Sequence, residues 1–502
     1  MNLKKEVQLA DGTAFPGRSF TEGVLKPIFN IQRDYYYRIF IDITKAHVVM
    51  LFEQKIISKD EITKILKGIR KLEEIDYSKA EYNEDFEDLF FMLERKLEEF
   101  LGKDIAGRIH IARSRNDIYL AEFRLALRNR AVELLDSTLN FRESLLYLIN
   151  DHFDTIMPAY THTQPAQPTT LAHYLLSYYD NVTRDYERIR RSIDTINKSP
   201  LGAAAITTTG FNISRERVCE LLGFDGLVEN SYDSIAGTDY ILELAGGIMV
   251  FATALSKFLK DILDFCTAEF NVFYLSDPYV QTSSIMPQKR NPSSLEHCRP
   301  MVGRAITEAK AAFDVLYNTP YGDIVDSEEE LQPHLYNSID ILRKVLKIMS
   351  NVLVTLKVNK GVLFKRAHER FITSTELADT LVREKGLSFR QSHHITKEIV
   401  RYIYENDLST EDIDEDIVKE IGKRIVGRDI DIDKNTIKTA LDPVNFVKIR
   451  DKTGGPAPKE TKRMYERRVE VFKEDLAAYK DYCKKLSTIK DILEENVDKY
   501  ID

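Results

Sequence analysis

Hydrophobic residues recur at every third or fourth position through most of this chain, which is the spacing of helices that bury one face. The pattern is clear over Asn30–Ile57, over Leu171–Ile196 and from Ile118 to about Asn150. The stretch Tyr240–Phe265 differs, because it is apolar on nearly all sides. Such a helix is expected to be enclosed by its neighbours. The whole pattern predicts an all-α protein with a long central helix bundle.

Capping residues and glycines mark where several helices begin or end. Ser58 and Ser214 predict two helix starts, and Gly102 predicts a helix end. The first 20 residues are polar and unpatterned, so we expect a loose arm there. At 502 residues the chain is too long for one ordinary core. We expect three helical domains: an N-terminal one over 1–112, the long bundle over 113–368, and a smaller one over 369–502 that ends in a charged helical tail.

Composition and charge exclude several classes of protein. A net charge of −9 argues against a nucleic-acid binder, which would show a basic surface. Four scattered cysteines without a CxxC pair indicate a reducing, cytoplasmic compartment and no disulfide or zinc framework. The longest charge-free apolar run, Ala245–Leu255, is too short to cross a bilayer, and no signal-peptide or metal-binding motif is present. We therefore expect no metal, cofactor, nucleic-acid or membrane partner.

The segment Thr282–Pro292 is the main candidate for chemistry. It reads Thr-Ser-Ser-Ile-Met-Pro-Gln-Lys-Arg-Asn-Pro and precedes a helical stretch that runs from Leu295 to about Tyr317. Two prolines, together with hydroxyl, amide and cationic side chains, predict a polar loop between helices. Loops of this kind on a rigid scaffold are frequent sites of catalysis and binding.

Two further segments carry polar residues of the same kind. Gly107–Asp117 places three arginines, a serine and an asparagine just before a long helix, an arrangement suited to binding a carboxylate. Tyr160–Pro168 contains Thr161, His162 and two prolines, and it predicts a loop because proline interrupts helix geometry. In isolation, a capped helix start and a structural histidine would account for these two segments.

The three segments together resemble conserved regions of the fumarase/aspartase superfamily, and of its argininosuccinate lyase branch in particular. Ser283–Pro292 is similar to the signature loop of the superfamily. Arg113–Asp117 is similar to the first conserved region of the branch, and Thr161–Gln164 to the second. Asp442–Asn445 and Thr453–Pro458 resemble the C-terminal domain of that branch. The resemblance covers nearly the whole chain.

The resemblance implies a homotetramer with four active sites, each built from three different chains. It also implies elimination of an amine from an N-(1,2-dicarboxyethyl) substrate, with release of fumarate. Ser283 would be the base, His162 the partner of the leaving amine and Glu296 the residue that orients this histidine. In the family the serine and histidine roles have been assigned both ways. Substrate contacts are implied for a larger set of positions: Arg113, Ser114, Arg115, Asn116, Thr161, Gln164, Ser284, Met286, Lys289 and Asn291.

This chemistry accounts for the residue types. Removal of a carbon-bound proton beside a carboxylate creates a doubly charged aci-carboxylate, which requires a base at the carbon and fixed donors around the charge. An ordinary serine is a very weak acid. Ser283 would therefore need loop amides and a cation to activate it, and a loop that closes to exclude water.

The amine side of the implied site departs from argininosuccinate lyases. The family usually has a Tyr, a Gln and a Lys in the segment before Pro333. Counted back from Pro333 without gaps, those positions hold Asp323, Glu328 and Leu331 in this chain. In another segment, Thr238 stands where the family has an Arg. Loss of cations and gain of acids disfavours a product that presents a carboxylate. We therefore count Asp323 and Glu328 among the candidate substrate contacts. A diamine, a polyamine or a guanidine stays open as an alternative product to arginine.

Two other interpretations compete with an argininosuccinate lyase-like enzyme. A non-catalytic structural homologue is disfavoured because the polar residues of the two loops are intact: Ser283, His162, Lys289 and Asn291. Another enzyme of the superfamily, such as adenylosuccinate lyase or aspartase, is disfavoured by Arg113–Asp117 and by the Gly-Gly-Pro-Ala-Pro stretch near the C-terminus. The favoured interpretation is a carbon–nitrogen lyase that acts on a small dicarboxylate.

Overall fold

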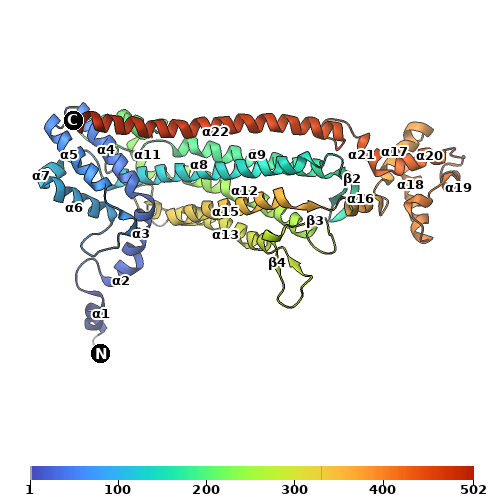
Figure 1. Cartoon of the computed structure of the whole chain (residues 1–502), viewed down its shortest axis with the longest axis horizontal. Coiled ribbons are helices and arrows are strands. Elements are labelled where there is room, and N and C mark those ends of the chain that lie inside the picture. Colours follow the sequence, from blue (N-terminus) through green and yellow to red (C-terminus); the bar gives the residue numbers. More distant parts are fainter. Residues whose placement is uncertain (1–2, 329–330, 502) are drawn as a thin grey trace.

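The computed structural model describes residues 3–328 and 331–501 as an elongated molecule with a helix bundle along its length (Figure 1). Five long helices make the bundle and share one apolar core: α8 (Arg115–Asn150), α9 (Leu171–Ile196), α12 (Asp239–Phe265), α13 (Ser293–Leu316) and α15 (Gln332–Thr355). The predicted all-α fold with a long central bundle is therefore confirmed. A homotetramer built on this bundle stays a prediction.

Helix α12 lies where its composition predicts. It packs against α9 and α13, and apolar side chains from Tyr240 to Phe265 form much of the core. By length and composition alone α12 could also cross a membrane, with a mean hydropathy of 1.5 over its most apolar window, and 44% of that window is buried inside the chain. An apolar helix in the core of a bundle has the same composition.

The N-terminal unit is a cluster of shorter helices with an apolar core of its own: α3 (Lys26–Tyr35), α4 (Tyr37–Glu53), α5 (Lys59–Glu73), a 3₁₀ turn (Tyr77–Lys79), α6 (Leu89–Leu101) and α7 (Lys103–Ile109). Two predicted boundaries are confirmed. Ser58 begins α5 through a capping box with Glu61, and Gly102 ends α6 with a φ of 76°.

The arm before α3 contains more regular structure than its polar sequence predicts. It includes α1 (Leu3–Asp11), α2 (Arg18–Phe20) and a π-helical turn (Thr21–Leu25), and it projects from the body of the molecule (Figure 1). α1 buries no side chain. The arm is thus helical, but α1 adds nothing to the core of its own chain.

At the other end, α16 (Lys360–His368) leads to a separate small cluster with its own core: α17 (Ser374–Lys385), α18 (Phe389–Glu405), a 3₁₀ turn (Thr410–Asp412), α19 (Glu415–Val426), α20 (Lys434–Leu441) and α21 (Pro443–Lys448). Short helices and three two-stranded antiparallel sheets connect the long helices: α10 (Arg215–Leu222), α11 (Ser231–Ala236), α14 (Val325–Glu328), a 3₁₀ turn (Asp277–Tyr279), β1 (Ile156–Thr161) with β2 (Gln164–Thr170), β3 (Phe273–Tyr274) with β6 (Lys357–Val358), and β4 (Gln281–Thr282) with β5 (Arg290–Asn291). Ser214 caps α10, as predicted.

The last helix, α22 (Pro458–Ile501), returns along the bundle to the N-terminal unit (Figure 1). It lies against α8 and α5. Midway, the buried Arg142 of α8 pairs with Asp475 at 2.7 Å. Near the end, the buried ammonium of Lys45 pairs with Glu73 at 2.5 Å and with Glu494 at 2.7 Å. The division into domains 1–112, 113–368 and 369–502 stays a prediction. Helix α22 belongs to the third of these ranges, but it packs against helices of the first and second ranges.

Replacing Glu494 by Gln should destabilise the attachment of α22. Lys45 is fully buried and would lose one of the two carboxylates with which it forms ion pairs among the described residues. We expect the free energy of unfolding to fall by about 1–3 kcal/mol in a denaturant titration. Asp498→Asn is the matched control, because it removes an exposed partner of Arg70 from the same helix and should cost less than about 1 kcal/mol. Equal losses in the two variants would contradict the role assigned to Lys45.

Candidate functional site

The first candidate segment forms the start of α8. Ser114 is the N-cap: its hydroxyl accepts the Asn116 amide, and its own N–H donates to Asp117 at 2.9 Å. Ser114 and Asn116 are half-buried. The N-terminus of a helix carries partial positive charge and unpaired N–H groups. This end of α8 is therefore suited to an anionic group such as a carboxylate.

The arginines beside Ser114 pair with carboxylates of the N-terminal unit. Arg115 donates to Asp88 at 3.0 Å and lies over a phenylalanine ring. The resemblance implies Arg113 as a substrate contact, but its side chain is buried and donates to Thr44 at 3.2 Å. The guanidinium of Arg113 is therefore enclosed by its own chain. It packs behind the start of α8 and is not exposed to a ligand.

Thr161 and His162 lie on a β-hairpin and not on the irregular loop that the prolines predict. Thr161 pairs with Gln164 across β1 and β2, so His162 and Thr163 form a two-residue turn. Their φ values are 50° and 64°. A type I′ hairpin turn requires positive φ at both positions, which is uncommon for such residues. The turn holds His162 exposed at the end of the hairpin, where a second molecule can reach it.

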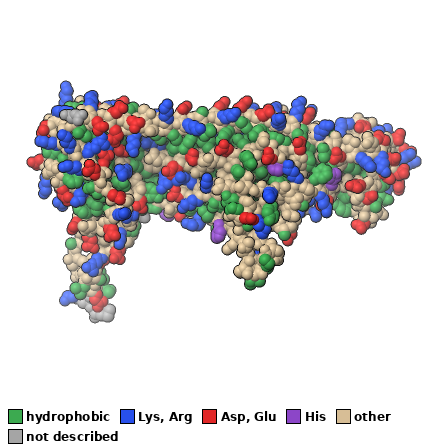
Figure 2. Space-filling view, viewed as in Figure 1, with side chains coloured by type: hydrophobic (Ala, Val, Ile, Leu, Met, Phe, Trp, Pro, Cys, Tyr) green, Lys and Arg blue, Asp and Glu red, His purple; other side chains and the backbone are tan. Residues whose placement is uncertain are grey.

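The segment Thr282–Pro292 is a second hairpin, which projects from the side of the bundle (Figures 1 and 2). β4 pairs with β5, and the residues between the strands form a loop. Figure 2 shows few charged side chains on this projection, whereas charged side chains crowd the ends of the molecule. Three predicted substrate contacts are exposed on the loop, and a fourth, half-buried, ends β5: Ser284, Met286, Lys289 and Asn291.

Ser283 occupies a turn at the start of this loop. Its Oγ accepts hydrogen bonds from the N–H of Ile285 at 3.2 Å and the N–H of Met286 at 3.0 Å. Donors directed at an oxygen favour its negatively charged form. The turn thus supplies two fixed donors that favour ionisation of the Ser283 hydroxyl.

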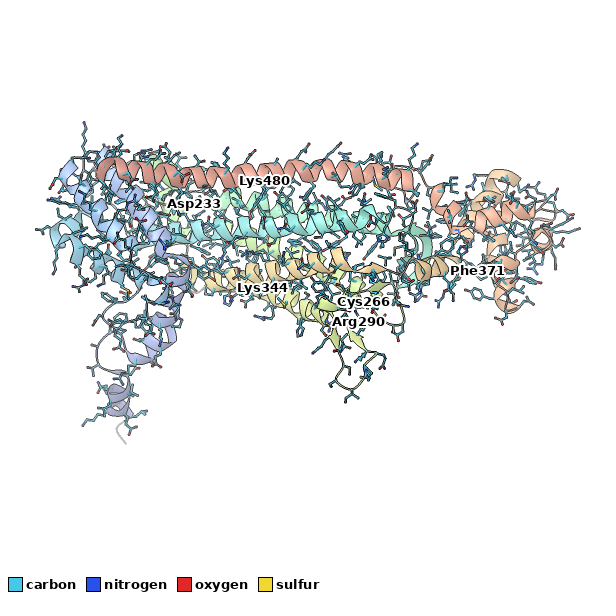
Figure 3. The ribbon with its side chains drawn as sticks, in the orientation of Figure 1. Asp233, Cys266, Arg290, Lys344, Phe371 and Lys480 are labelled. Carbon is cyan, nitrogen blue, oxygen red and sulfur yellow. The ribbon has the colours of Figure 1, made fainter. Side chains whose placement is uncertain are left out.

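Arg290, which was not among the predicted site residues, anchors the hairpin. Its guanidinium donates to the Leu275 carbonyl at 2.9 Å, pairs with Asp277 at 2.8 Å and lies 4.5 Å from the centre of the Tyr274 ring. Figure 3 shows Arg290 where the hairpin meets the bundle. The partners come from β3 and from the residues that connect it to β4, so the sequence offered only one signal, the place of Arg290 in the signature string.

The segment that departs from the family pattern borders α8: Ile235 of α11 packs with Leu120 near the start of α8, and α14 also contacts that helix. Tyr321 donates to the Asp233 carboxylate at 2.7 Å, and its ring stacks on Tyr232. Asp323 is exposed just before α14. Glu328 ends α14, and its side chain lies outside the described part of the structure. An acidic and aromatic surface therefore borders the proposed carboxylate site.

The three candidate segments lie apart in one chain. Ser114 precedes α8 and Thr161 follows it, and a helix of 36 residues is about 54 Å long at roughly 1.5 Å per residue. Ser283 lies on the side projection, and Figure 3 separates its neighbour Arg290 from Asp233 along the long axis. Glu296 is exposed in the first turn of α13. Over residues 3–328 and 331–501, no hydrogen bond or ion pair joins any two of these segments.

The possible metal ligands and the cysteine thiols of the described residues offer little for metal or thiol chemistry. Within the described part of the chain, no group of three or more His, Cys, Asp or Glu residues is placed to hold a metal ion. All four cysteines are free. Burial raises the pKa of Cys266 and of Cys298 to about 12. Both thiols are therefore protonated and unreactive near neutral pH.

Comparison with known proteins gives two family matches. A family described as "Lyase" matches residues 28–307, and "Argininosuccinate lyase C-terminal" matches residues 371–448. The argininosuccinate lyase of Methanocaldococcus jannaschii is 37% identical over 487 residues, covering 95% of this chain and 97% of that protein. That of Methanosarcina barkeri is 38% identical over 444 residues, covering 88% of this chain and 89% of that protein.

Solved structures extend the comparison to the fold. EDDS lyase in complex with formate superposes with a TM-score of 0.87 at 32% identity, covering 99% of this chain and 98% of that chain. A variant of EDDS lyase is solved with bound fumarate and superposes equally well. Class II fumarase from Schistosoma mansoni has a TM-score of 0.66 at 15% identity over 84% of this chain and 91% of that chain, which shows a shared fold.

Replacing Arg290 by Lys should loosen the projecting hairpin without unfolding the bundle. Lysine keeps the charge, but it lacks the planar fork that donates to Leu275 and Asp277 while lying over an aromatic ring. We expect faster amide hydrogen exchange across residues 281–291 and a shift in melting temperature below about 2 °C. Arg304→Lys, at an exposed position of α13, is the control. Unchanged exchange in the Arg290 variant would mean that strand pairing alone holds the hairpin.

Proposed function

Because the chain belongs to the argininosuccinate lyase-like branch of the fumarase/aspartase superfamily, whose carbon–nitrogen lyases release fumarate, we propose that it cleaves argininosuccinate to arginine and fumarate. The reaction would serve arginine biosynthesis in the cytoplasm. The high identity to argininosuccinate lyases over almost the full length of both chains supports this substrate. The proposal requires no cofactor.

The observation that carries the proposal is the turn around Ser283. Two amides of the same loop donate hydrogen bonds to its Oγ. Ser283 would take the proton from the carbon beside the substrate carboxylate, and the electron pair would move into that carboxylate as the aci-form. The C–N bond would then break, and His162 would pass a proton to the leaving amine directly or through water. Glu296 would orient His162.

Fixed donors around the carboxylate account for the other polar residues. Ser114 and Asn116 lie at the positive end of α8, where an oxyanion is stabilised. Thr161 and Gln164 pair across the turn that carries His162. Lys289 and Asn291 flank Arg290 at the end of the Ser283 loop, from which they would neutralise the charge that develops in the transition state.

A shared active site follows from the same geometry. The two ends of α8 are about 54 Å apart by helix length, so Ser114 and His162 of one chain cannot meet at one substrate. We therefore propose a homotetramer in which different chains supply the start of α8, the His162 hairpin and the Ser283 loop. The hairpins, which expose their tips, are the elements that would reach a neighbouring chain.

A second candidate function differs only in the amine. Asp233 of α11, which accepts the hydrogen bond of Tyr321, lies beside the start of α8, and Asp323 is exposed two residues after Tyr321; the amine product would lie against these acids. Acids there favour a diamine, a polyamine or a guanidine over the carboxylate of arginine. The likeness to EDDS lyase, an enzyme named for another substrate, supports a change of substrate within this fold.

Ser283→Ala should abolish most fumarate release from argininosuccinate. Loss of a positioned base typically lowers kcat by about 10²–10⁴-fold. The assay is fumarate absorbance in the ultraviolet, with Thr282→Ala, an exposed neighbour that is not a predicted substrate contact, as the control, which should lose less than about tenfold. If argininosuccinate is inert, fumarate combined with a panel of diamines, polyamines and guanidines should yield an adduct by mass spectrometry. A wild-type protein that neither releases fumarate from argininosuccinate nor forms an adduct from fumarate and an amine would overturn the proposed function. That result would favour a non-catalytic homologue.

Mixing two inactive variants should restore activity if sites are shared between chains. Ser283→Ala and His162→Ala chains, unfolded together and refolded as an equal mixture, would form some sites with both residues intact. Random assembly gives about a quarter of the wild-type activity. Each variant refolded alone is the control. An inactive mixture that elutes as a tetramer would contradict the shared site, whereas a monomeric elution would contradict the assembly itself.

A further inference from the structure

Asp117 is a buried carboxylate that the proposed chemistry does not use. It is the third residue of α8 and has no exposed surface. One oxygen accepts the Ser114 N–H at 2.9 Å. The other accepts the N–H of Gly202 at 2.9 Å and the N–H of Ala204 at 3.0 Å. One side chain thus binds amides from two segments 85 residues apart in sequence.

The second segment, residues 201–205, adopts a backbone that is matched to this carboxylate. Gly202 and Ala204 have φ values of 83° and 51°, and positive φ is uncommon for a residue with a Cβ. Asn116 adds a further bond, because its side-chain amide donates to the Ala205 carbonyl at 3.1 Å. The bonds that hold this segment therefore also fix Ser114 and Asn116.

Asp117 is charged at neutral pH, although burial acts against that form. Asp117, Arg113, Arg215 and His47 line the same small enclosed cavity. Burial raises the pKa of Asp117 to about 6, and the three amides and Arg113 act against that rise. Burial also lowers the pKa of His47 to about 3, so this ring is neutral. The carboxylate therefore faces two cations and no competing imidazolium.

We propose that Asp117 is a positioning residue: it couples the carboxylate-binding start of α8 to segment 201–205 and thereby fixes Ser114 and Asn116 for the substrate. The proposal rests on the proposed function, because it takes these two side chains as ligands of the fumaryl carboxylate. Side chains that bind a ligand are held by the bonds behind them, and a misplacement of about 1 Å can cost about 10²-fold in rate.

The test compares Asp117→Asn with the wild-type chain. Asparagine keeps the size of the side chain, but one of its two acceptor oxygens becomes an NH₂ group that faces N–H donors. We expect faster amide hydrogen exchange in peptides that cover residues 201–205. We also expect fumarate affinity, measured by calorimetry, to fall about ten- to hundredfold. Ala204→Gly leaves Asp117 intact and removes the Cβ at positive φ. This variant should fold normally, with a smaller rise in exchange over residues 201–205 and a smaller fall in fumarate affinity than Asp117→Asn.

Glu61→Gln is the matched control, because Glu61 closes the same kind of capping box with Ser58 at the start of α5. It should leave fumarate affinity unchanged. Unchanged exchange at 201–205 in Asp117→Asn would overturn the coupling, and faster exchange with wild-type affinity would overturn the positioning role. A wild-type chain that does not bind fumarate contradicts the proposed function. The exchange measurement alone then decides whether Asp117 couples the two segments.

Discussion

The architecture depends on the burial of α8 along its full length. α8 packs against α9, α15 and α22, and two of its arginines turn inward to reach the ends of other helices. Arg124 donates to the Thr195 carbonyl at the end of α9, and Arg128 donates to the Gly223 carbonyl at the end of α10. A cation at a helix C-terminus meets unpaired carbonyls and partial negative charge. These bonds fix α8 in the bundle and therefore fix the distance between its two ends.

That fixed distance constrains how the polar segments can cooperate. A rigid helix cannot shorten, so groups at its two ends can share a ligand only across an interface between chains. The elements that would cross such an interface are two hairpins, each stabilised locally. Paired strands hold the His162 turn, and Arg290 anchors the loop of Ser283. Preorganisation within each chain reduces the ordering that assembly must provide.

The sequence predicts what depends on local chemistry. Helix periodicity located the bundle, and the caps at Ser58, Ser214 and Gly102 lie where hydroxyl and glycine residues indicated. The His162 turn was missed, because positive φ at His162 and Thr163 carries none of the glycine or asparagine signal of hairpin turns. The burial of Arg113 was missed as well. It depends on Thr44, which is distant in sequence, and an exposed arginine has the same local pattern.

The return of α22 has a consequence for how the protein is made. The core of the N-terminal unit includes Leu493, Val497 and Tyr500, so its inner surface is completed by residues from the far end of the chain. A chain emerging from the ribosome exposes that apolar surface until residues 493–500 have been synthesised. The helices of the N-terminal unit therefore complete their core only after α22 has been synthesised, and translation that stops before α22 leaves this apolar surface exposed to aggregation.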